Sequence, residues 1–560
     1  PPYWEAENQD IVVLPSCSFD PRELRKVRGL HQYEERFLHR ILHLARPGTR
    51  VIFVTSVPVD PDLVAYHLSL LPPTVEGAGA LLGTRLIMVS VDDGRPDRCL
   101  ARKFVEKPRL VGRVRRLVDE RRRADPAVRP ARLEVYRRTR YEALAARALG
   151  LELKGAEPEL LRWGTKSGSR AVFADAGVPH VPGTFEAERD VGRLAERVAA
   201  VLAATAASAA SNPRFLAPAP AAAKSRHRVA VKGMVKLEDG FAGLGNGLVD
   251  LSAAFSLAAR DGGADSGSVE RLVLDAFGEM QFQSEEENWP SFRRAIESIG
   301  AVFELFVPKS DGQTTPSVQA YIKEHAPTCG GGGGGGGGDA DVVVLSTHEQ
   351  ILDGHAYGGC EFPAGEAYRA RLEEHARAVG RALARRGEVG HFGVDFIATP
   401  SGSGDGTSYL LDALEINLRT TGTTCPLMML KLLERSHDPR PAEAGGGGGG
   451  TGVSHGHYIA FDHFGKADYT VFTPADLHEM LADLSLARGG AEPCSAGRVR
   501  DAGILLYMHG AVAELGTFGI AFVGPTREDC RKLVLEVERR LDDEALRCKA
   551  AAPEPDDNPA

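Results

Sequence analysis

The chain lacks several features that would assign it to a specialised class of protein. Its eight cysteines are scattered and show no C-x-x-C spacing. This distribution indicates neither a zinc site nor a disulfide framework, and it favours a reduced, cytosolic compartment. No stretch approaches the roughly 18 to 20 apolar residues that a membrane-spanning helix needs. The sequence therefore predicts a cytoplasmic protein with no membrane partner.

An excess of positive charge is also missing. The formal net charge is −9 at pH 7 and the pI is about 6.1. This balance argues against nucleic acid as a partner. The local exception is the segment 112–140, which holds eleven arginines. Its interspersed acidic residues favour a solvated helix face over a site for a polyanion.

Length and patterning predict a large α/β protein. The chain has 560 residues, 43% of them hydrophobic, which suggests three or four domains with real cores. In the first 155 residues, β-type runs at 11–14, 51–54 and 86–89 alternate with helical patterns at 34–45 and 62–71. This alternation predicts a layer with a parallel sheet. The chain begins at Pro1 without a methionine or a secretory apolar segment, so we expect a fragment or a processed chain.

Low-complexity stretches interrupt this pattern. Alanine, serine and proline crowd residues 199–223, and glycine runs occupy 330–338 and 445–450. Glycine loses more backbone entropy on ordering than other residues, so such runs rarely adopt one conformation. We therefore expect disordered inserts at about 205–225 and 329–339, and a domain boundary at the second glycine run.

A lysine followed by a glycine-rich loop is the most informative local motif. Lys236 ends a β-type run, and Gly240, Gly243 and Gly245 follow it. Without Cβ atoms, the backbone can turn its N–H groups toward a polyphosphate, and the lysine supplies a compact positive charge. Lys232 is an alternative for this role, but Lys236 abuts the loop. The motif predicts a site for nucleotide phosphates.

Three oxygen-bearing side chains further along the chain suggest a magnesium site. Glu415 and Asn417 are two residues apart, so on an extended strand they point to the same side. Asp395 interrupts an apolar run, where an unpaired charge would be costly, although it could also be a satisfied core carboxylate. Magnesium prefers oxygen ligands and usually keeps waters and substrate phosphates in its shell. Carboxylates plus an amide oxygen would therefore suffice.

Further motifs occur in a fixed order over about residues 48–535. They are R-V-I-F-V-T-S at 50–56, G-T-K-S-G-S-R at 164–170, A-G-V-P-H at 176–180, T-P-S-V-Q at 315–319, L-S-T-H-E-Q at 345–350, G-V-D-F at 393–396, G-T-T-C-P at 422–426 and L-G-T-F-G at 515–519. With the lysine–glycine loop and the E-I-N-L-R segment at 415–419, this order resembles the ATP-grasp superfamily. Within it, the chain is similar to the pheganomycin-type peptide ligases and to the eukaryotic IQ-motif-containing protein H.

The resemblance implies a fold and domain limits. The fold would be an ATP-grasp fold of the α/β and α+β classes, with a Rossmann-like α/β domain before it and an α/β segment after it. We expect residues 1–155 to form the first domain, 156–440 the ATP-grasp domain, 453–548 the C-terminal segment and 549–560 a tail. No I-Q-x-x-x-R pattern is present, so the sequence does not support calmodulin binding.

The resemblance also implies an activity. The protein would be an ATP- and Mg²⁺-dependent ligase that joins the carboxylate of an amino acid or peptide to an amine through an acyl phosphate. Asp395, Glu415 and Asn417 would hold Mg²⁺. The alternative is a nucleotide-binding scaffold that keeps the fold without turnover.

Roles in nucleotide binding follow in the same way. Lys166 and Lys236 would contact the ATP phosphates, residues 240–245 would cover them, and Arg419 would lie beside the reacting phosphate, which makes Lys236 and Arg419 catalytic. The adenine hinge would lie near residues 303–307, with Glu304 contacting the ribose or the hinge. On its own, Lys166 could instead be a surface lysine near a helix start capped by Ser167 or Ser169.

One position departs from the family pattern. Cys425 stands where the G-T-T-H-P segment of the family usually has histidine. This change concerns substrate handling rather than nucleotide binding. We expect His348 and His391 to be structural histidines outside the catalytic set.

Overall fold

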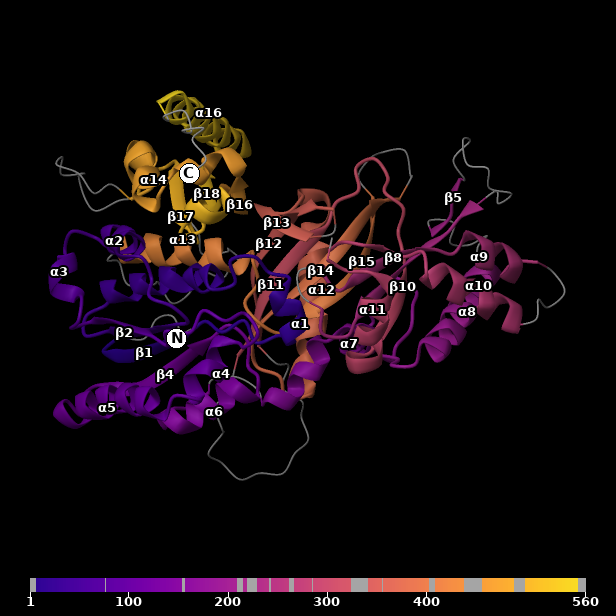
Figure 1. The fold of residues 1–560 in the computed structure, drawn as a ribbon, viewed down its shortest axis with the longest axis horizontal. Coiled ribbons are helices and arrows are strands. Elements are labelled where there is room, and N and C mark those ends of the chain that lie inside the picture. Colours follow the sequence, from indigo (N-terminus) through magenta and orange to yellow (C-terminus); the bar gives the residue numbers. More distant parts are fainter. Residues whose placement is uncertain are drawn as a thin grey trace, which may run out of the picture.

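The computed structural model describes residues 7–75, 77–153, 157–208, 215–218, 229–240, 243–260, 266–284, 286–323, 341–354, 356–401, 408–437, 456–487 and 499–551. Both glycine runs, and most of the insert expected at 205–225, lie outside these residues. In Figure 1, elements from the two ends of the chain lie together on the left, and the middle of the chain extends to the right.

The N-terminal part forms a parallel sheet in the order β3-β2-β1-β4. The strands are β1 (Gln9–Leu14), β2 (Arg50–Thr55), β3 (Leu86–Ser90) and β4 (Arg129–Val135). Alternate residues pack on opposite faces, because successive side chains of a strand point to opposite sides. Ile11 and Phe53 belong to one core cluster, and Val12 and Ile52 to another. The predicted parallel α/β layer is confirmed.

Helices follow the strands of this sheet. They are α1 (Pro21–Arg25), the 3-10 helix η2 (Gln32–Ala45), α2 (Pro61–Ser69), α3 (Ala78–Leu81), α4 (Leu100–Val105), α5 (Pro108–Ala124) and α6 (Arg140–Leu149). The helical pattern predicted at 34–45 is therefore a 3-10 helix, and the one at 62–71 is α2.

The middle of the chain begins with a small antiparallel sheet in the order β10-β7-β8-β9. Its strands are β7 (Lys232–Leu237), β8 (Asn246–Asp250), β9 (Gln281–Phe282) and β10 (Ala301–Leu305), beside the short pair β5 (Ala217–Pro218) and β6 (Val229–Ala230). One core cluster joins this sheet to the helices α8 (Val191–Ala207), α9 (Ser252–Ala258), α10 (Ser266–Phe277) and α11 (Trp289–Ile299). The glycine loop connects β7 to β8.

An eight-stranded sheet forms the centre of the molecule, in the order β15-β14-β11-β12-β13-β16-β18-β17. Its strands are β11 (Pro316–Ile322), β12 (Val342–Asp353), β13 (Ala356–Phe362), β14 (Gly390–Pro400), β15 (Tyr409–Asn417), β16 (His457–Gly465), β17 (Gly503–Tyr507) and β18 (Thr517–Gly524). The neighbouring helices are η3 (Pro158–Gly164), α7 (Lys166–Ala176), α12 (Glu366–Arg385) and α13 (Thr424–His437).

The C-terminal segment extends this sheet. Strand β16 pairs antiparallel with β13, so the ladder crosses the domain boundary predicted before residue 453. The remaining helices are η5 (Ala467–Val471), α14 (Pro474–Leu481), η6 (Ala482–Leu484), α15 (Val512–Leu515) and α16 (Arg527–Ala551). Contacts also join the two chain ends: Leu506 N–H donates to the Tyr66 hydroxyl at 2.8 Å. The domain limits themselves stay predictions.

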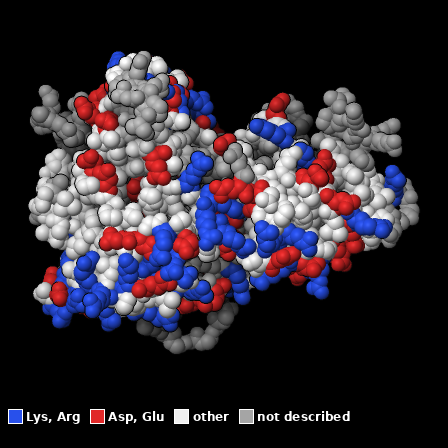
Figure 2. All heavy atoms as spheres, viewed as in Figure 1, with Lys and Arg blue, Asp and Glu red and all other residues white. Residues whose placement is uncertain are grey.

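Within the described residues, no helix is both long and apolar enough to cross a membrane. Figure 2 shows Lys and Arg intermixed with Asp and Glu over the face it presents.

The arginine-rich segment is divided among several environments. Arg115 on α5 is exposed, whereas Arg132 on β4 is buried and paired with Glu134 at 2.6 Å. A solvated helix face therefore accounts for only part of that segment.

Glu34 on η2 is a buried carboxylate whose ionisation opposes folding. It is 5% exposed and accepts hydrogen bonds from the backbone N–H and the hydroxyl of Ser56, at 2.6 and 2.5 Å. Burial raises the pKa of Glu34 from 4.5 to about 7. An acid whose pKa is higher in the folded state favours folding while protonated, so this contribution is lost as the pH rises from about 4.5 through about 7.

We therefore expect Glu34→Gln to gain stability over the unmodified protein as the pH rises, because glutamine does not ionise. Between pH 5 and pH 8, the free energy of unfolding of the variant, relative to that of the unmodified protein, should rise by at most about 3 kcal/mol. Melting curves of both proteins at the two pH values measure it. An equal difference in melting temperature at both pH values would contradict the expectation.

Candidate active site

An open cleft lies where the N-terminal part, the glycine loop and the end of β15 meet. Its empty space, open solvent included, is about 370 Å³. Its lining residues come from these three regions, from η3 and from the start of α7: Phe19, Arg137, Leu161, Gly164, Lys166, Glu238, Asp239, Gly240, Asn417, Leu418 and Arg419. Of the predicted site residues, Lys166, Gly240, Asn417 and Arg419 line this cleft, whereas Lys236, Asp395 and Glu415 do not.

The described residues of the glycine loop, which do not include 241 and 242, make a tight turn at the edge of this cleft. Gly245 lies so close to Gly240 that a Cβ on Gly245 would approach the Gly240 Cα to 3.1 Å. Gly243 has a φ of +80°, a left-handed conformation that favours glycine. Leu237 N–H donates to the Gly245 carbonyl at 2.9 Å and closes the turn. Larger residues at Gly243 and Gly245 would strain this backbone.

Lys236 lies on β7, directly before this loop, and is 9% exposed. Its ammonium pairs with Glu304 at 2.5 Å, and Arg170 pairs with the same carboxylate at 3.3 Å. Glu304 is 2% exposed on β10, the strand next to β7. It is therefore the counterion of two buried cations, and a contact with the ribose stays a prediction.

Much of the predicted adenine hinge already bonds within the protein. Phe303 N–H donates to the Thr184 hydroxyl at 2.9 Å, and Leu305 N–H donates to the Pro182 carbonyl at 2.8 Å. Phe306 N–H donates to the Lys232 carbonyl at 3.0 Å. An adenine edge would have to meet the remaining backbone groups of residues 303–307.

The three predicted metal ligands converge on one point. Asp395 on β14 lies directly opposite Glu415 on β15, and Gly393 lies opposite Asn417. Paired residues of antiparallel strands point to the same face. The Asn417 amide donates to Asp395 Oδ2 at 3.0 Å and to Glu415 Oε1 at 3.3 Å. The side chains could therefore share one or two ions.

The two carboxylates have different electrostatic surroundings. Burial raises the pKa of Asp395, and the nearby charge of Glu415 raises it further. Burial would also raise the pKa of Glu415, but Lys166 and Lys236 outweigh it and hold that pKa below its usual range. The described residues contain no group of three or more His, Cys, Asp or Glu side chains arranged for a metal. The predicted metal ligands Asp395, Glu415 and Asn417 are not such a group, because they supply two carboxylates and one amide.

Lys166 is the first residue of α7 and connects three parts of the site. Its ammonium pairs with Glu415. The neighbouring Ser167 hydroxyl and N–H donate to Glu238 of the glycine loop, at 2.5 and 3.0 Å. Thr165 caps the helix, rather than Ser167 or Ser169, by accepting from Gly168 N–H at 3.2 Å. The start of α7, the glycine loop and β15 are thereby held together.

The cleft contains an arginine that the sequence analysis missed. Arg137, which follows β4, donates to Asp239 of the glycine loop at 2.7 Å and to the Ser18 carbonyl at 3.0 Å. The predicted Arg419 lies with its guanidinium over the rings of Phe19 and Tyr136, 5.5 and 5.6 Å from their centroids. Arg137 was hidden among the eleven arginines of its segment, and only the domain packing brings it to the loop.

His348 is buried outside this cleft and is bonded to the Tyr458 hydroxyl at 2.5 Å. Burial lowers the pKa of His348, and of His391, to about 3. Neither ring lines the cleft. This agrees with their predicted structural role.

A curated relative decides the family. The L-propargylglycine–L-glutamate ligase of Streptantibioticus cattleyicolor is 30% identical to this chain over 422 residues, which cover 73% of this chain and 71% of the relative. The chain belongs to the ATP-grasp superfamily. Its group is the carboxylate–amine ligases of that superfamily.

Other comparisons are weaker. IQ motif-containing protein H of Danio rerio is 21% identical over 421 residues, and the match covers 69% of this chain but 35% of that protein. Biotin carboxylase of Campylobacter jejuni, solved with β,γ-ATP, has a TM-score of 0.47 at 13% identity, with 95% of this chain and 91% of that one covered. An N5-carboxyaminoimidazole ribonucleotide synthetase solved with ADP has a TM-score of 0.45 at 11% identity, with 96% and 98% covered. No protein-family model matches the chain.

Cys425, the departure from the ATP-grasp ligase pattern, is the second residue of α13 and is 3% exposed. Burial raises the pKa of its thiol to about 12, although the cation of Arg36 opposes this. Arg36 is itself buried and paired with Asp462. A larger side chain at position 425 would meet a filled interior beside a buried cation.

We therefore expect Cys425→His to destabilise the fold by about 1–3 kcal/mol through overpacking. Any rise in melting temperature induced by ATP should be retained, because Cys425 does not line the cleft. Melting curves with and without ATP measure both quantities. An unchanged melting temperature without ATP would show that the site accepts the larger ring. The role of Cys425 in substrate handling stays a prediction.

Proposed function

We propose that this protein is an ATP- and Mg²⁺-dependent ligase that joins the carboxylate of an amino acid or peptide to an amine through an acyl phosphate. The observation that carries the proposal is the convergence of Asp395, Glu415 and Asn417 beside Lys166. Asn417 and Lys166 line one cleft with the glycine loop. A binding module without turnover has no physical need for clustered carboxylates, because bringing like charges together is costly.

The donor set fits Mg²⁺. Two carboxylates and an amide provide the hard oxygen ligands that this ion prefers, and their partial burial leaves room for phosphate oxygens and water. The raised pKa of Asp395 supports the fit, because a dication would offset the repulsion between the two carboxylates. When bound, Mg²⁺ would neutralise charge on the ATP phosphates.

The cations in the cleft and on the adjoining strand β7 would act on the phosphates directly. Lys236 and Lys166 would balance the charge of the polyphosphate, and the N–H groups of the glycine loop would cover it. In the first step, a substrate carboxylate oxygen attacks the γ-phosphorus and the bond to ADP breaks. Arg419 would stabilise the charge that develops on the transferred phosphoryl oxygens.

In the second step, an amine attacks the carbonyl carbon of the acyl phosphate. The C–N bond forms, the C–O bond to phosphate breaks, and the amine loses a proton. No protein nucleophile is needed in either step. The name of the Streptantibioticus relative refers to two amino acids, which supports amino acids as the substrate class here. A cytosolic location and the absence of nucleic-acid partners stay predictions.

A substrate screen tests the proposal. Purified protein, ATP and Mg²⁺ are incubated with pooled amino acids and short peptides, and ADP release is measured with and without hydroxylamine. Hydroxylamine should trap the acyl phosphate as a hydroxamate. If ATP binds but no pool gives ADP or hydroxamate, the protein is a nucleotide-binding scaffold rather than a ligase.

A further inference from the structure

Gln350 on β12 is a half-buried polar side chain that the proposed mechanism does not use. It belongs to the L-S-T-H-E-Q motif at 345–350, one of the motifs that carry the family resemblance. Its amide Nε2 donates to Asp395 Oδ1 on β14 at 3.0 Å. Strand β11 lies between β12 and β14, so this bond joins residues two strands apart. Gln350 is therefore a partner of a predicted metal ligand without being a predicted ligand itself.

The register of the central sheet explains how Gln350 reaches Asp395. Ser317 on β11 lies opposite Asp395 on one side and opposite His348 of β12 on the other. Paired residues of antiparallel strands point to the same face, and so do residues two positions apart on one strand. Gln350 therefore faces the same side as Asp395. Neighbouring strands are about 4.8 Å apart, so a side chain must be long to span the roughly 10 Å between β12 and β14.

Both oxygens of the Asp395 carboxylate accept hydrogen bonds from amides. Gln350 donates to Oδ1, and Asn417 on β15 donates to Oδ2, each at 3.0 Å. The carboxylate cannot rotate about its Cβ–Cγ bond without breaking one of these bonds. Its plane is therefore fixed, with Oδ1 toward β12 and Oδ2 toward β15. Because Asn417 is itself a predicted metal ligand, Gln350 is the donor whose role is confined to Asp395.

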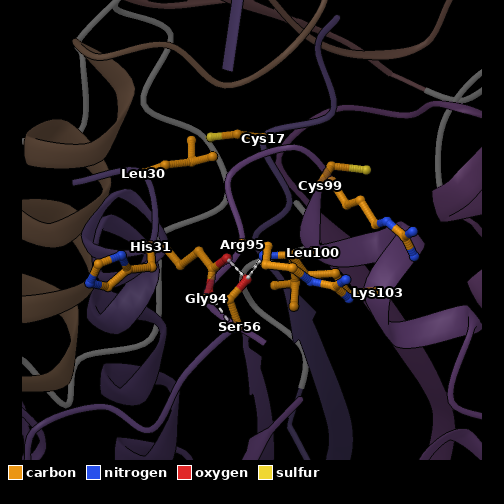
Figure 3. Close-up of a pocket in the computed structure, with 11 residues that line it drawn as sticks. Cys17, Leu30, His31, Ser56, Gly94, Arg95, Cys99, Leu100 and Lys103 are labelled. Carbon is orange, nitrogen blue, oxygen red and sulfur yellow. Dashed lines mark hydrogen bonds between the residues drawn. The ribbon is translucent and has the colours of Figure 1, made fainter. Parts of the chain in front are cut away.

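Amide donors orient a carboxylate without adding a positive charge beside it. The buried Glu34 shows a different arrangement: it bonds to the Ser56 hydroxyl, which also accepts from the Lys103 ammonium at 3.3 Å (Figure 3). Asp395 forms no ion pair with any residue that the structure describes, and both of its amide donors are neutral. Its negative charge therefore stays available to a cation that enters the site.

We propose that Gln350 is a positioning residue, which holds Asp395 in the orientation that ligates Mg²⁺. The proposal rests on the proposed function, because it takes Asp395 as a ligand of the ion that the ligase reaction uses. A carboxylate that is already fixed loses less rotational freedom when an ion binds, so the affinity for the ion is higher. A neutral amide suits this role, because a lysine in its place would compete with the ion for the carboxylate.

Gln350→Met tests the proposal, because methionine has a similar length but no N–H donor. Mn²⁺ is titrated into the full chain with a non-hydrolysable ATP analogue, and the relaxation rate of water protons measures the Mn²⁺ that the protein holds. A titration of the analogue alone is subtracted. The Kd of Mn²⁺ should rise about 10- to 100-fold, as is typical when a metal ligand loses its hydrogen-bond partner.

A double-mutant cycle with Asp395→Asn separates positioning from direct ligation. A residue that acts only through the Asp395 carboxylate has little left to do when that carboxylate is gone. In the Asp395→Asn background, Gln350→Met should therefore change the Kd of Mn²⁺ by less than about twofold. Binding stays measurable there, because the phosphates of the analogue still hold the ion.

Gln313→Met is the matched control. Gln313 is also half-buried, and its amide donates to the Thr399 hydroxyl, on the same strand as Asp395, at 3.3 Å. Its replacement should leave the Kd of Mn²⁺ unchanged within about twofold. Circular dichroism and melting curves without metal check the fold. If Gln350→Met fails to fold, Gln350→Asn replaces it, because asparagine keeps the amide but is too short to span the two strands.

Three results would overturn the proposal: the unmodified protein holds no Mn²⁺ beyond the analogue alone, Gln350→Met binds Mn²⁺ as tightly as the unmodified protein, or it weakens binding equally with and without the Asp395 carboxylate. The last two leave the ligase function standing. Failure of the ligase function has a different signature, because the Kd values would differ as expected while ADP and hydroxamate are absent from every substrate pool.

Discussion

Glu415→Gln should lower ATP-dependent hydroxamate formation by about 10² to 10³, the cost of losing one charge-stabilising group in a transition state. Glu415 contributes a negative charge to the proposed metal site and pairs with Lys166. Glutamine keeps the size of the side chain but removes the charge that would hold a dication. The expected loss therefore lies in the chemical step, and the rate is measured at saturating ATP and Mg²⁺.

Glu361→Gln is the matched control for this change. Glu361 lies on β13 of the same sheet and pairs with Arg527 at 3.1 Å, away from the cleft. It should retain hydroxamate formation within about twofold, as surface substitutions far from a site usually do. Retention of activity by Glu415→Gln itself, with normal folding, would remove Glu415 from the metal site.

Lys236→Ala should weaken ATP binding by about 10- to 150-fold, the loss expected for one charge-assisted contact of about 1.5–3 kcal/mol. The ATP-induced rise in melting temperature should fall with it, because a ligand stabilises a fold according to its affinity. The substitution also leaves Glu304 with Arg170 as its remaining counterion, so the melting temperature without ATP should fall too. ATP is titrated at a temperature well below the melting transitions of both proteins. This measurement separates the loss of ATP affinity from the loss of stability.

Lys232→Ala supplies the control. Lys232 begins the same strand, four residues before Lys236, but its side chain is exposed. Its replacement should leave the ATP affinity unchanged. Equal losses of affinity in the two variants would mean that Lys236 has no special contact with the nucleotide.

Short-range patterns made part of the site predictable. Glu415 and Asn417 share a strand face because side chains alternate along a strand, and the loop after Lys236 is tight because Gly243 and Gly245 stand where other residues would be strained. The parallel sheet of the first domain followed from its alternating apolar runs. Each of these features depends on residues that are close in the sequence.

Long-range features were not predictable in the same way. Asp395 meets Glu415 because β14 and β15 pair in one register, and a shift by one residue would have turned Asp395 away. Arg137 reaches Asp239 only because the first domain packs against the glycine loop. No local pattern encodes a contact between residues about a hundred positions apart.

Glu304 is the position where the two kinds of information differ most. Its place in the segment 303–307 suggested a contact with the nucleotide, whereas its carboxylate is the shared partner of Lys236 and Arg170. A buried carboxylate requires a counterion, and which cations supply it depends on the packing of β7, β10 and α7.

The sequence by itself determined the superfamily, the parallel N-terminal layer and the residue types of the site, because motifs and strand periodicity are local properties of the chain. The tertiary structure decided which charges are paired, that β16 continues the central sheet, and that Gln350 reaches Asp395 from two strands away. These depend on strand register and domain packing, in which many weak contacts act together across the whole chain.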